Sequence, residues 1–287
     1  MLSYRHGFHA GNHADVLKHM LLIRLLRCMT AKPKPMVYLD THAGGGRYDL
    51  QHAWADKTGE AKAGVRRLLE EAKSLPSLSP MLDDYYQHLM ADSSGPRGLR
   101  YYPGSPMIAS QLLREEDRLL LCELHSDEVQ RLRQGVSQWG HANTAVHCRD
   151  AWEAMKALLP TQPRRALVMI DPAYEVKQDY QSAVKSLLLA TERFAEGVYA
   201  LWYPMLPAGL HRQMLRQLER LDVKGGLLDV RLQVRGESEG MHGSGVFLIN
   251  PPWQFEAGLK EALQQVSDLL AEDSAAEGRI RWVKPRP

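Results

Sequence analysis

Three acidic residues, Glu123, Asp150 and Asp171, stand at or just beyond the ends of short apolar runs in the sequence. Runs of this kind are typical of strands buried on both faces of a parallel sheet. The carboxyl ends of parallel strands meet at one edge, where open α/β sheets bind their ligands. We therefore expect the three carboxylates to gather around one binding site.

A glycine cluster follows another apolar run, residues 36–40. Residues 41–46 read THAGGG, and glycines let the backbone approach a ligand closely. The pattern is not G-x-G-x-x-G and no Lys-Ser/Thr follows it, so binding of ATP or GTP through a P-loop is disfavoured. The cluster indicates a nucleotide-like ligand, with a plain tight loop as the alternative.

Glu123 and Asp150 narrow the choice of ligand. A carboxylate that ends the strand after a glycine-rich loop can accept hydrogen bonds from both hydroxyls of a ribose. In dehydrogenases it follows the glycines by about 20 residues, and here a helical insertion lengthens the interval. Asp150 could accept a hydrogen bond from the amino group of adenine, although on its own it is better explained as a helix N-cap. Together these parts predict binding of S-adenosylmethionine, which needs no phosphate cradle.

Asp171 begins the tetrapeptide Asp171-Pro172-Ala173-Tyr174. It resembles Asp/Asn-Pro-Pro-Tyr/Phe/Trp, which occurs in enzymes that methylate exocyclic amino groups. The nitrogen of an aromatic amine is a poor nucleophile because its lone pair is delocalised into the ring. Asp171 and the carbonyl of Pro172 could accept hydrogen bonds from its two N–H groups. This would favour the pyramidal geometry from which the lone pair can attack a sulfonium methyl group, while Tyr174 stacks on the base. The alternative is a surface turn, which Asp-Pro pairs often begin.

A second tetrapeptide, Asn250-Pro251-Pro252-Trp253, matches that pattern with both prolines present. It follows the final predicted strand, which is remote from the glycine cluster in strand order. We therefore expect Asn250 to terminate a strand, and position favours Asp171 as the reactive site.

Apolar runs alternate with amphipathic patterns along most of the chain, which predicts a doubly wound, mostly parallel sheet. A closing pair at 227–234 and 246–249 adds one antiparallel member. No strand is evident between His42 and Leu99. Residues 50–98 show helical patterns, which predicts a helical subdomain inserted into a single domain of residues 1–49 and 99–287. Residues 102–106 are predicted to form a turn, and the end of the chain a polar tail. The five expected strands are 36–40, 118–123, 143–148, 166–170 and 198–203.

The composition is that of an ordinary globular protein, with 44% hydrophobic and 24% charged residues and a net charge of +2. Nucleic-acid binding would therefore need a local basic patch. Residues 1–50 offer one, with seven lysines and arginines against three aspartates.

The three cysteines, Cys28, Cys122 and Cys148, have no paired spacing, and we expect Cys122 and Cys148 in the core. No signal-peptide hydrophobic region opens the sequence, and residues 20–26 are too short to span a bilayer. These features predict a cytoplasmic protein.

His9 and His13 are four residues apart, a spacing that suggests metal ligands. The Gly-Asn pair between them argues against one helical face, and no acidic or cysteine partner lies nearby in the sequence. We expect no metal. With Tyr4, Arg5 and Lys18, these histidines are better suited to RNA phosphates and stacked bases.

Five segments carry a resemblance to one family. Residues 1–6, 8–19, 38–44, 100–106 and 250–253 look like the bacterial RlmJ family, whose members are adenine-N6 methyltransferases of large-subunit (23S) ribosomal RNA. The resemblance runs nearly end to end, although the insertion matches less well. It implies a Rossmann-like class I methyltransferase fold with an inserted helical subdomain.

The resemblance also implies roles for particular residues. It assigns Tyr4, His6 and Lys18 to the RNA or the reaction, in a tail (residues 1–19) folded over the cofactor. Two departures from the family pattern are Ala173, in place of its second proline, and Gly45, in place of alanine; Ala151 stands where glycine is expected. Neither proposed acceptor is lost at Ala173, so we expect retained activity. The implied S-adenosylmethionine contacts are His19, His42, Ser105, Glu123, Asp150, Ala151 and Asp171.

The resulting expectation is a cytoplasmic, monomeric enzyme that methylates the N6 of one adenine in naked or partly assembled 23S rRNA. Asp171, Pro172 and Tyr174 are its expected catalytic residues, and no metal is required. The alternatives are a DNA-adenine methyltransferase, a protein glutamine-N5 methyltransferase, and a non-catalytic RNA-binding protein on the same fold.

Overall fold

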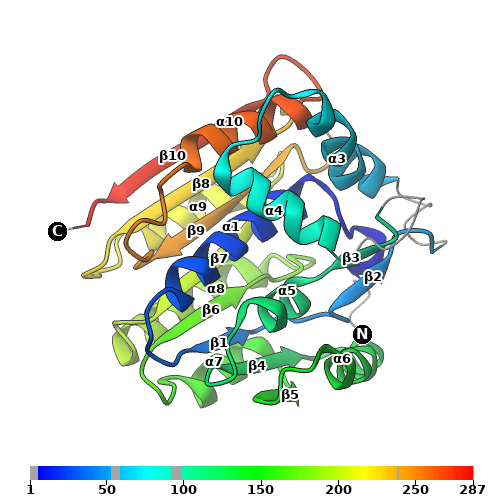
Figure 1. Ribbon diagram of the computed structural model, residues 1–287. Coiled ribbons are helices and arrows are strands. Elements are labelled where there is room, and N and C mark those ends of the chain that lie inside the picture. The colour runs from blue at the N-terminus through cyan, green and yellow to red at the C-terminus, as the bar shows by residue number, and fades with distance from the viewer. Residues whose placement is uncertain (1–5, 53–58, 92–98, 238, 287) are drawn as a thin grey trace.

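The computed structural model describes residues 6–52, 59–91, 99–237 and 239–286. At its centre lies an eight-stranded sheet with the strand order β10-β8-β9-β7-β6-β1-β4-β5 (Figure 1). A separate two-stranded ribbon is formed by β2 and β3.

Five strands make up the parallel half of the sheet. Central β1 pairs with β4 on one side and with β6 on the other, and every residue of β1 and β6 is buried. Helices cover both faces, which explains why these strands are continuous apolar runs. The predicted parallel sheet is confirmed. Its strands are β1 (Val37–Asp40), β4 (Arg118–Glu123), β5 (Thr144–Cys148), β6 (Ala166–Ile170) and β7 (Val198–Met205).

The other half of the sheet contains two strands that run against the parallel set. β9 (Gly243–Ile249) is antiparallel to both β7 and β8 (Leu227–Gln233), which confirms the predicted closing pair. β10 (Glu277–Lys284) adds a second antiparallel edge strand beside β8. The predicted polar tail was therefore wrong. Exposed charges such as Arg279 and Arg281 suit an edge strand and conceal it in the sequence.

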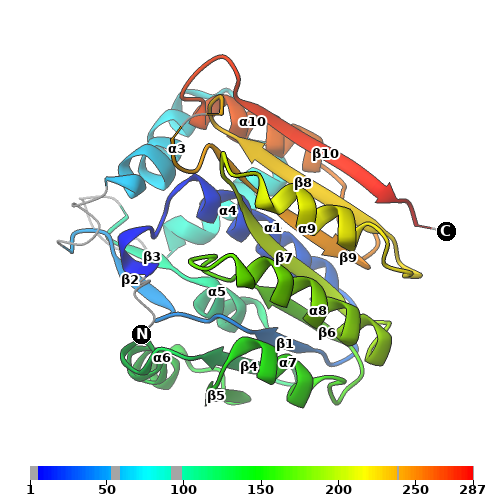
Figure 2. The same ribbon diagram turned by 180° about the vertical axis from the view of Figure 1, so that it is seen from behind.

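Two helical layers enclose the sheet. The layer in front in Figure 1 contains α1 (His13–Thr30), α5 (Ser105–Leu112) and α10 (Leu259–Leu270), and α6 (Ser126–Trp139) packs beside α5. The opposite layer, seen in Figure 2, contains α7 (Ala151–Leu158), α8 (Gln178–Arg193) and α9 (Leu210–Leu218). No helix in the described ranges is long and apolar enough to cross a membrane.

The described part of the predicted insertion is mostly helical. It contains η2 (Lys62–Arg66), α3 (Arg67–Glu71), η3 (Ala72–Ser74) and α4 (Pro80–Ala91). α4 packs on the outer side of α1, and the apolar residues of the insertion join the core formed by α1 and α10. This cover buries α1 almost all round, including its polar residues Asp15, Lys18 and His19. The 50–98 boundary stays a prediction.

Two expectations about local structure were wrong. β2 (Arg47–Asp49) pairs with β3 (Tyr101–Pro103) in an antiparallel ribbon, where no strand and a turn were predicted. Strands of three residues are too short to show a periodic pattern. Cys148 is exposed because it ends the edge strand β5, whereas Cys122 is buried as expected.

Candidate active site

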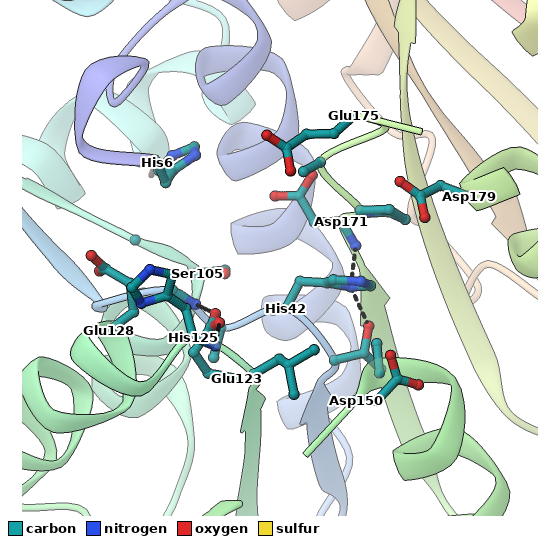
Figure 3. A pocket seen from close by; sticks show the side chains of 18 of the residues that line it. His6, His42, Ser105, Glu123, His125, Glu128, Asp150, Asp171, Glu175 and Asp179 are labelled. Atoms are coloured by element: carbon teal, nitrogen blue, oxygen red, sulfur yellow. Dashed lines mark hydrogen bonds between the residues drawn. The ribbon is translucent and has the colours of Figure 1, made fainter. Parts of the chain in front are cut away.

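A pocket lies at the carboxyl ends of β1, β4, β5 and β6, bordered by the N-terminal segment and α6 (Figure 3). The structure brings nearly all the predicted site residues together there. Its lining includes His6, Lys18, His19, His42, Ser105, Glu123, Asp150, Ala151, Asp171 and Pro172. Tyr4 lies outside the described residues, and Tyr174 does not line the pocket.

Glu123 joins the end of β4 to the glycine-rich loop. Its Oε2 accepts a hydrogen bond from the backbone N–H of Gly44 (2.8 Å), and its Oε1 accepts one from His125 (2.7 Å). Gly44 has φ +60°, and a Cβ there would lie 2.3 Å from the hydroxyl oxygen of Tyr48. Each carboxylate oxygen can accept more than one hydrogen bond, so Glu123 is held in place with capacity left for a ligand.

Asp150 is the N-cap of α7. Its Oδ1 accepts hydrogen bonds from the backbone N–H groups of Trp152 (2.9 Å) and Glu153 (3.0 Å). The simpler explanation of this residue is therefore confirmed. Asp150 also lines the pocket. Its side chain does not accept from the N–H of Ala151, the first residue of the helix, so this N–H could donate a hydrogen bond to a ligand.

Asp171 is tied to the N-terminal segment by a chain of buried charges. Its Oδ2 accepts a hydrogen bond from Nζ of Lys18 (2.6 Å), and Nζ also lies 2.7 Å from Oδ1 of Asp15. His6 Nε2 lies 3.0 Å from Oδ2 of Asp15. Burial alone would lower the pKa of Lys18, but Asp15 and Asp171 raise it above its usual value. Lys18 is thus a permanent cation beside Asp171.

His42 and Asp40 connect Asp171 to the end of β1 through hydrogen bonds. The backbone N–H of Asp171 donates to Nδ1 of His42 (3.3 Å), and the N–H of His42 donates to Oδ1 of Asp40 (3.2 Å). Burial lowers the pKa of His42 to about 4, so its imidazole is neutral at neutral pH. Burial also raises the pKa of Asp40 to about 6, although hydrogen bonds from Ser105 and Tyr38 oppose the shift.

His19 and Ser105 complete the side of the pocket nearest α1. His19 Nδ1 lies 2.8 Å from the hydroxyl of Tyr102, which is buried beside Tyr85. Burial lowers the pKa of His19 well below its ordinary value. Ser105 is the first residue of α5, and Gly104 and Ser105 both line the pocket, so this helix begins at the pocket.

Tyr174 takes a different position from the one predicted. Its φ is +52°, its side chain is 8% exposed, and its hydroxyl donates to the carbonyl of Trp202 (2.9 Å). The ring packs against Tyr180, with centroids 4.4 Å apart. This placement in the core does not support stacking of Tyr174 on a base.

Asn250 closes a turn at the opposite edge of the sheet, because it follows the antiparallel strand β9. Its Oδ1 accepts from the N–H of Gly225, and its Nδ2 donates to the carbonyls of Ala195 and Gly197, each at 2.8 Å. It does not line the pocket. The prediction that Asn250 terminates a strand is confirmed.

His9 and His13 lie outside the pocket lining. His9 Nδ1 lies 2.8 Å from Oε1 of Glu60, an acidic partner that the sequence did not reveal because it comes from the insertion. Burial lowers the pKa of His13 to about 4. The described residues contain no group of three side chains that could hold a metal ion.

The pocket also contains residues that were not singled out in the sequence, among them Trp152 and Glu128. Trp152 stands next to Ala151 on α7 and contacts His42 edge to face, with ring centroids 5.5 Å apart. Glu128 lies on α6 and borders the pocket beside the glycine loop. Both are helical positions, and the sequence shows the face of a helix only approximately.

Comparisons with known proteins identify the family of the chain. A family model described as "Ribosomal RNA large subunit methyltransferase D, RlmJ" matches residues 33–284. Two curated proteins named "Ribosomal RNA large subunit methyltransferase J", from Haemophilus influenzae and Escherichia coli, are 41% and 40% identical to the chain. Each alignment covers 99% of the chain and 100% of the relative.

A solved structure also matches nearly end to end. The crystal structure of a Legionella pneumophila protein superimposes with a TM-score of 0.85 and 35% sequence identity, and covers 96% of this chain and 98% of that one. The strand order, with one antiparallel strand inserted beside β7, is that of a class I methyltransferase. The chain therefore belongs to the RlmJ family of ribosomal RNA large subunit methyltransferases.

Proposed function

We propose that the protein transfers a methyl group from S-adenosylmethionine to the N6 of an adenine in 23S rRNA. The observation that carries this proposal is the position of Asp171 and Pro172. They stand at the end of β6, in the same pocket as the carboxylates of Glu123 and Asp150. Hydrogen-bond acceptors for the target amine thus lie next to a site suited to an adenosyl group.

The residues of the pocket fit S-adenosylmethionine. Glu123 accepts hydrogen bonds from the ribose hydroxyls. Asp150 and the N–H of Ala151 bind the adenine. His19, His42 and Ser105 border the amino-acid end and the centre of the cofactor, and Asp171 borders its reactive end. Bound there, the cofactor supplies an electrophilic methyl group on a sulfonium.

Asp171 and Pro172 orient the target amine. The carboxylate and the Pro172 carbonyl accept hydrogen bonds from the two N–H groups of the adenine N6. This directs the lone pair of N6 toward the methyl group. Lys18 and the N–H-accepting His42 hold Asp171 in position. Transfer forms an N–C bond, breaks the S–C bond, and leaves a proton on N6 that passes to Asp171 or to water. Ala173 replaces the family's second proline without removing either acceptor, so activity is retained.

The surface beside the pocket fits RNA. On the ribbon β2–β3, the guanidinium groups of Arg47 and Arg100 lie 4.1 and 4.9 Å from the ring centre of Tyr101. Arginines held on an aromatic ring are suited to phosphates and unstacked bases. We assign this ribbon, together with Tyr4 and His6 of the N-terminal segment, to the RNA. Residues 13–19 belong to helix α1 and not to a tail, and Lys18, buried between Asp15 and Asp171, serves the reaction by holding Asp171. We further propose that residues 50–98 form a subdomain that supports this surface.

A methyl-transfer assay with labelled S-adenosylmethionine tests the substrate class. Naked 23S rRNA, assembled large subunits, DNA and protein extract are compared. We expect label in rRNA, bound to the N6 of adenine, and an apparent monomer in size-exclusion chromatography. Label in DNA or on glutamine would replace the proposal by the corresponding alternative. Absence of cofactor binding in calorimetry would favour a non-catalytic RNA-binding protein. A cytoplasmic site of action, where ribosomal RNA is modified, is part of the proposal.

A further inference from the structure

The insertion contacts the N-terminal segment at the residues that lead into helix α1. The carboxylate of Glu60, two residues before η2, binds two of them. Its Oε1 lies 2.8 Å from Nδ1 of His9, and its Oε2 accepts a hydrogen bond from Nδ2 of Asn12 (2.9 Å). Burial alone would raise the pKa of Glu60, but the hydrogen bonds from His9 and Asn12 lower it below its usual value. Glu60 is therefore an anion that joins the insertion to the N-cap of α1.

Backbone contacts bring the two segments close together at the same place. The N–H of Val65 donates to the carbonyl of Gly11 (2.7 Å). A Cβ at Gly64 would lie 2.2 Å from that carbonyl oxygen and 2.7 Å from the carbonyl carbon of Asn12. Because these neighbours are backbone atoms, they cannot rotate away as a side chain can, and only glycine permits the approach. Residues 11–12 are thus held by both the backbone and a side chain of the insertion.

Gly11 and Asn12 in turn hold Asp15. The N–H of Gly11 donates to Oδ2 of Asp15 (2.8 Å), and Oδ1 of Asn12 accepts from the N–H of Asp15 (2.9 Å). The carboxylate of Asp15 lies 3.0 Å from Nε2 of His6 and 2.7 Å from Nζ of Lys18, and both of these residues line the pocket. The position of Asp15 therefore determines where two side chains of the pocket lie.

A continuous chain of contacts thus runs from the insertion to the proposed acceptor of the target amine. It passes from Glu60 through Asn12, Asp15 and Lys18 to Asp171, and its last step joins Nζ of Lys18 to Oδ2 of Asp171 (2.6 Å). The three inner members of the chain are at most 6% exposed. Water cannot readily replace a partner lost from such buried groups.

We propose that Glu60 is a positioning residue for methyl transfer, which fixes the start of α1 and, through Asp15 and Lys18, the carboxylate of Asp171. The inference rests on the proposed function, because that function makes Asp171 an acceptor for the target amine. Glu60 does not line the pocket, so it acts only through the residues that it holds. A misplacement of about 1 Å caused by a distant substitution can lower a rate by about 100-fold.

Steady-state kinetics on rRNA at pH 8 tests this role. We expect Glu60→Ala to lower kcat by about 10- to 100-fold. The affinity for S-adenosylhomocysteine, measured by calorimetry, should stay within about threefold of the wild type, since Glu60 is outside the pocket. Glu60→Gln should restore kcat to within about threefold of the wild type. Its amide can accept from Asn12 and donate to Nδ1 of His9, which is neutral at this pH once the carboxylate is removed.

Gly64→Ala is a second test, and Glu71→Ala is the matched control. In Gly64→Ala the added Cβ displaces the backbone of residues 11–12, so kcat should fall without any change of charge. Glu71 belongs to the same insertion, but its ion pair with Arg67 (2.9 Å) stays within α3. Glu71→Ala should therefore transfer methyl groups at the wild-type rate. Thermal unfolding of each variant gives a temperature at which all of them are folded.

Each other outcome overturns the inference. Wild-type kcat in Glu60→Ala, with or without a lower Tm, makes the contact purely structural. A parallel loss of S-adenosylhomocysteine affinity in Glu60→Ala, or an equal loss of kcat in Glu71→Ala, makes the effect a general one. If Glu60→Ala does not fold, wild-type kcat in Gly64→Ala contradicts the inference in its place. A wild-type enzyme that methylates no adenine in rRNA contradicts the proposed function instead, so the two failures are distinguishable.

Discussion

Asp171 belongs to a network of buried charged side chains that extends to the N-terminal segment. Lys18 joins it to Asp15, and Asp15 accepts the N–H of Gly11 (2.8 Å). Removing one partner of a buried ion pair costs about 3–5 kcal/mol because the remaining charge is uncompensated. His6 and Lys18 therefore border the pocket, and Lys18 holds the carboxylate that we propose to act in it.

Replacement of Tyr174 separates two explanations of the tetrapeptide. In Tyr174→Leu the hydroxyl bond to Trp202 and part of the core packing are lost, so we expect a destabilisation of about 2–4 kcal/mol. Because the ring does not line the pocket, kcat/KM of the folded enzyme should stay within about threefold of the wild type. Thermal unfolding and steady-state kinetics on rRNA check both values. A stable variant with a selectively raised KM for RNA would restore the stacking role.

At the scale of elements, the direction of each strand decides which tetrapeptide can react. β6 runs parallel to its neighbours and delivers Asp171 to the pocket, whereas β9 runs the other way and places Asn250 at the far edge. The sequence order of the strands was sufficient to prefer Asp171. The ribbon β2–β3 was not predictable, because its strands have three residues and pair across the insertion.

Asn250→Ala should destabilise the protein without impairing catalysis. It removes three hydrogen bonds that join the segments before β7 and β8, and it places alanine at φ +54°. We expect a loss of about 2–4 kcal/mol in the free energy of unfolding, measured by denaturant titration. The methyl-transfer rate per folded molecule should equal that of the wild type. A large loss of rate with normal stability would assign Asn250 to the reaction.

The ribbon β2–β3 should contribute to RNA affinity and not to cofactor affinity. In the double variant Arg47→Ala/Arg100→Ala, the slope of log affinity against log salt should decrease by about 0.7–0.9 for each lost phosphate contact. Filter binding at several salt concentrations measures the slope. Arg164→Ala, which removes an exposed arginine paired with Glu196, is the control. An unchanged slope in the double variant, or an equal change in the control, contradicts this assignment.

For the whole molecule, the mostly parallel sheet and the position of the pocket followed from the sequence, while the order of the strands in the sheet and the burial of particular side chains did not. The alternation of apolar runs and helical patterns predicted the parallel sheet, and strand ends predicted Glu123, Asp150 and Asp171. Tyr174 could not be placed from the sequence, because its positive φ turns the side chain into the core. Glu128 and Trp152 depend on how helices α6 and α7 are rotated against the sheet.

The protein should lose stability as the pH falls below neutral. Burial lowers the pKa of His13, His42 and His211 to about 4, whereas a histidine in the unfolded chain titrates near 6.5. Between these values the unfolded state binds more protons, so lowering the pH favours unfolding. We expect Tm to fall from pH 7 to pH 4.5. His211→Phe, which keeps an aromatic ring against Tyr203, should reduce that fall. An equal or steeper dependence in the variant would contradict the burial of a neutral His211.

The most direct test of the central claim is the mass-spectrometric yield of N6-methyladenine in 23S rRNA incubated with S-adenosylmethionine. It is measured for the wild type, Asp171→Ala and Asn250→Ala, each checked for folding and for S-adenosylhomocysteine binding. We predict N6-methyladenine with the wild type and with Asn250→Ala. Asp171→Ala should give none while remaining folded and able to bind S-adenosylhomocysteine. Wild-type yield from Asp171→Ala, or loss of the product only in Asn250→Ala, would contradict the account.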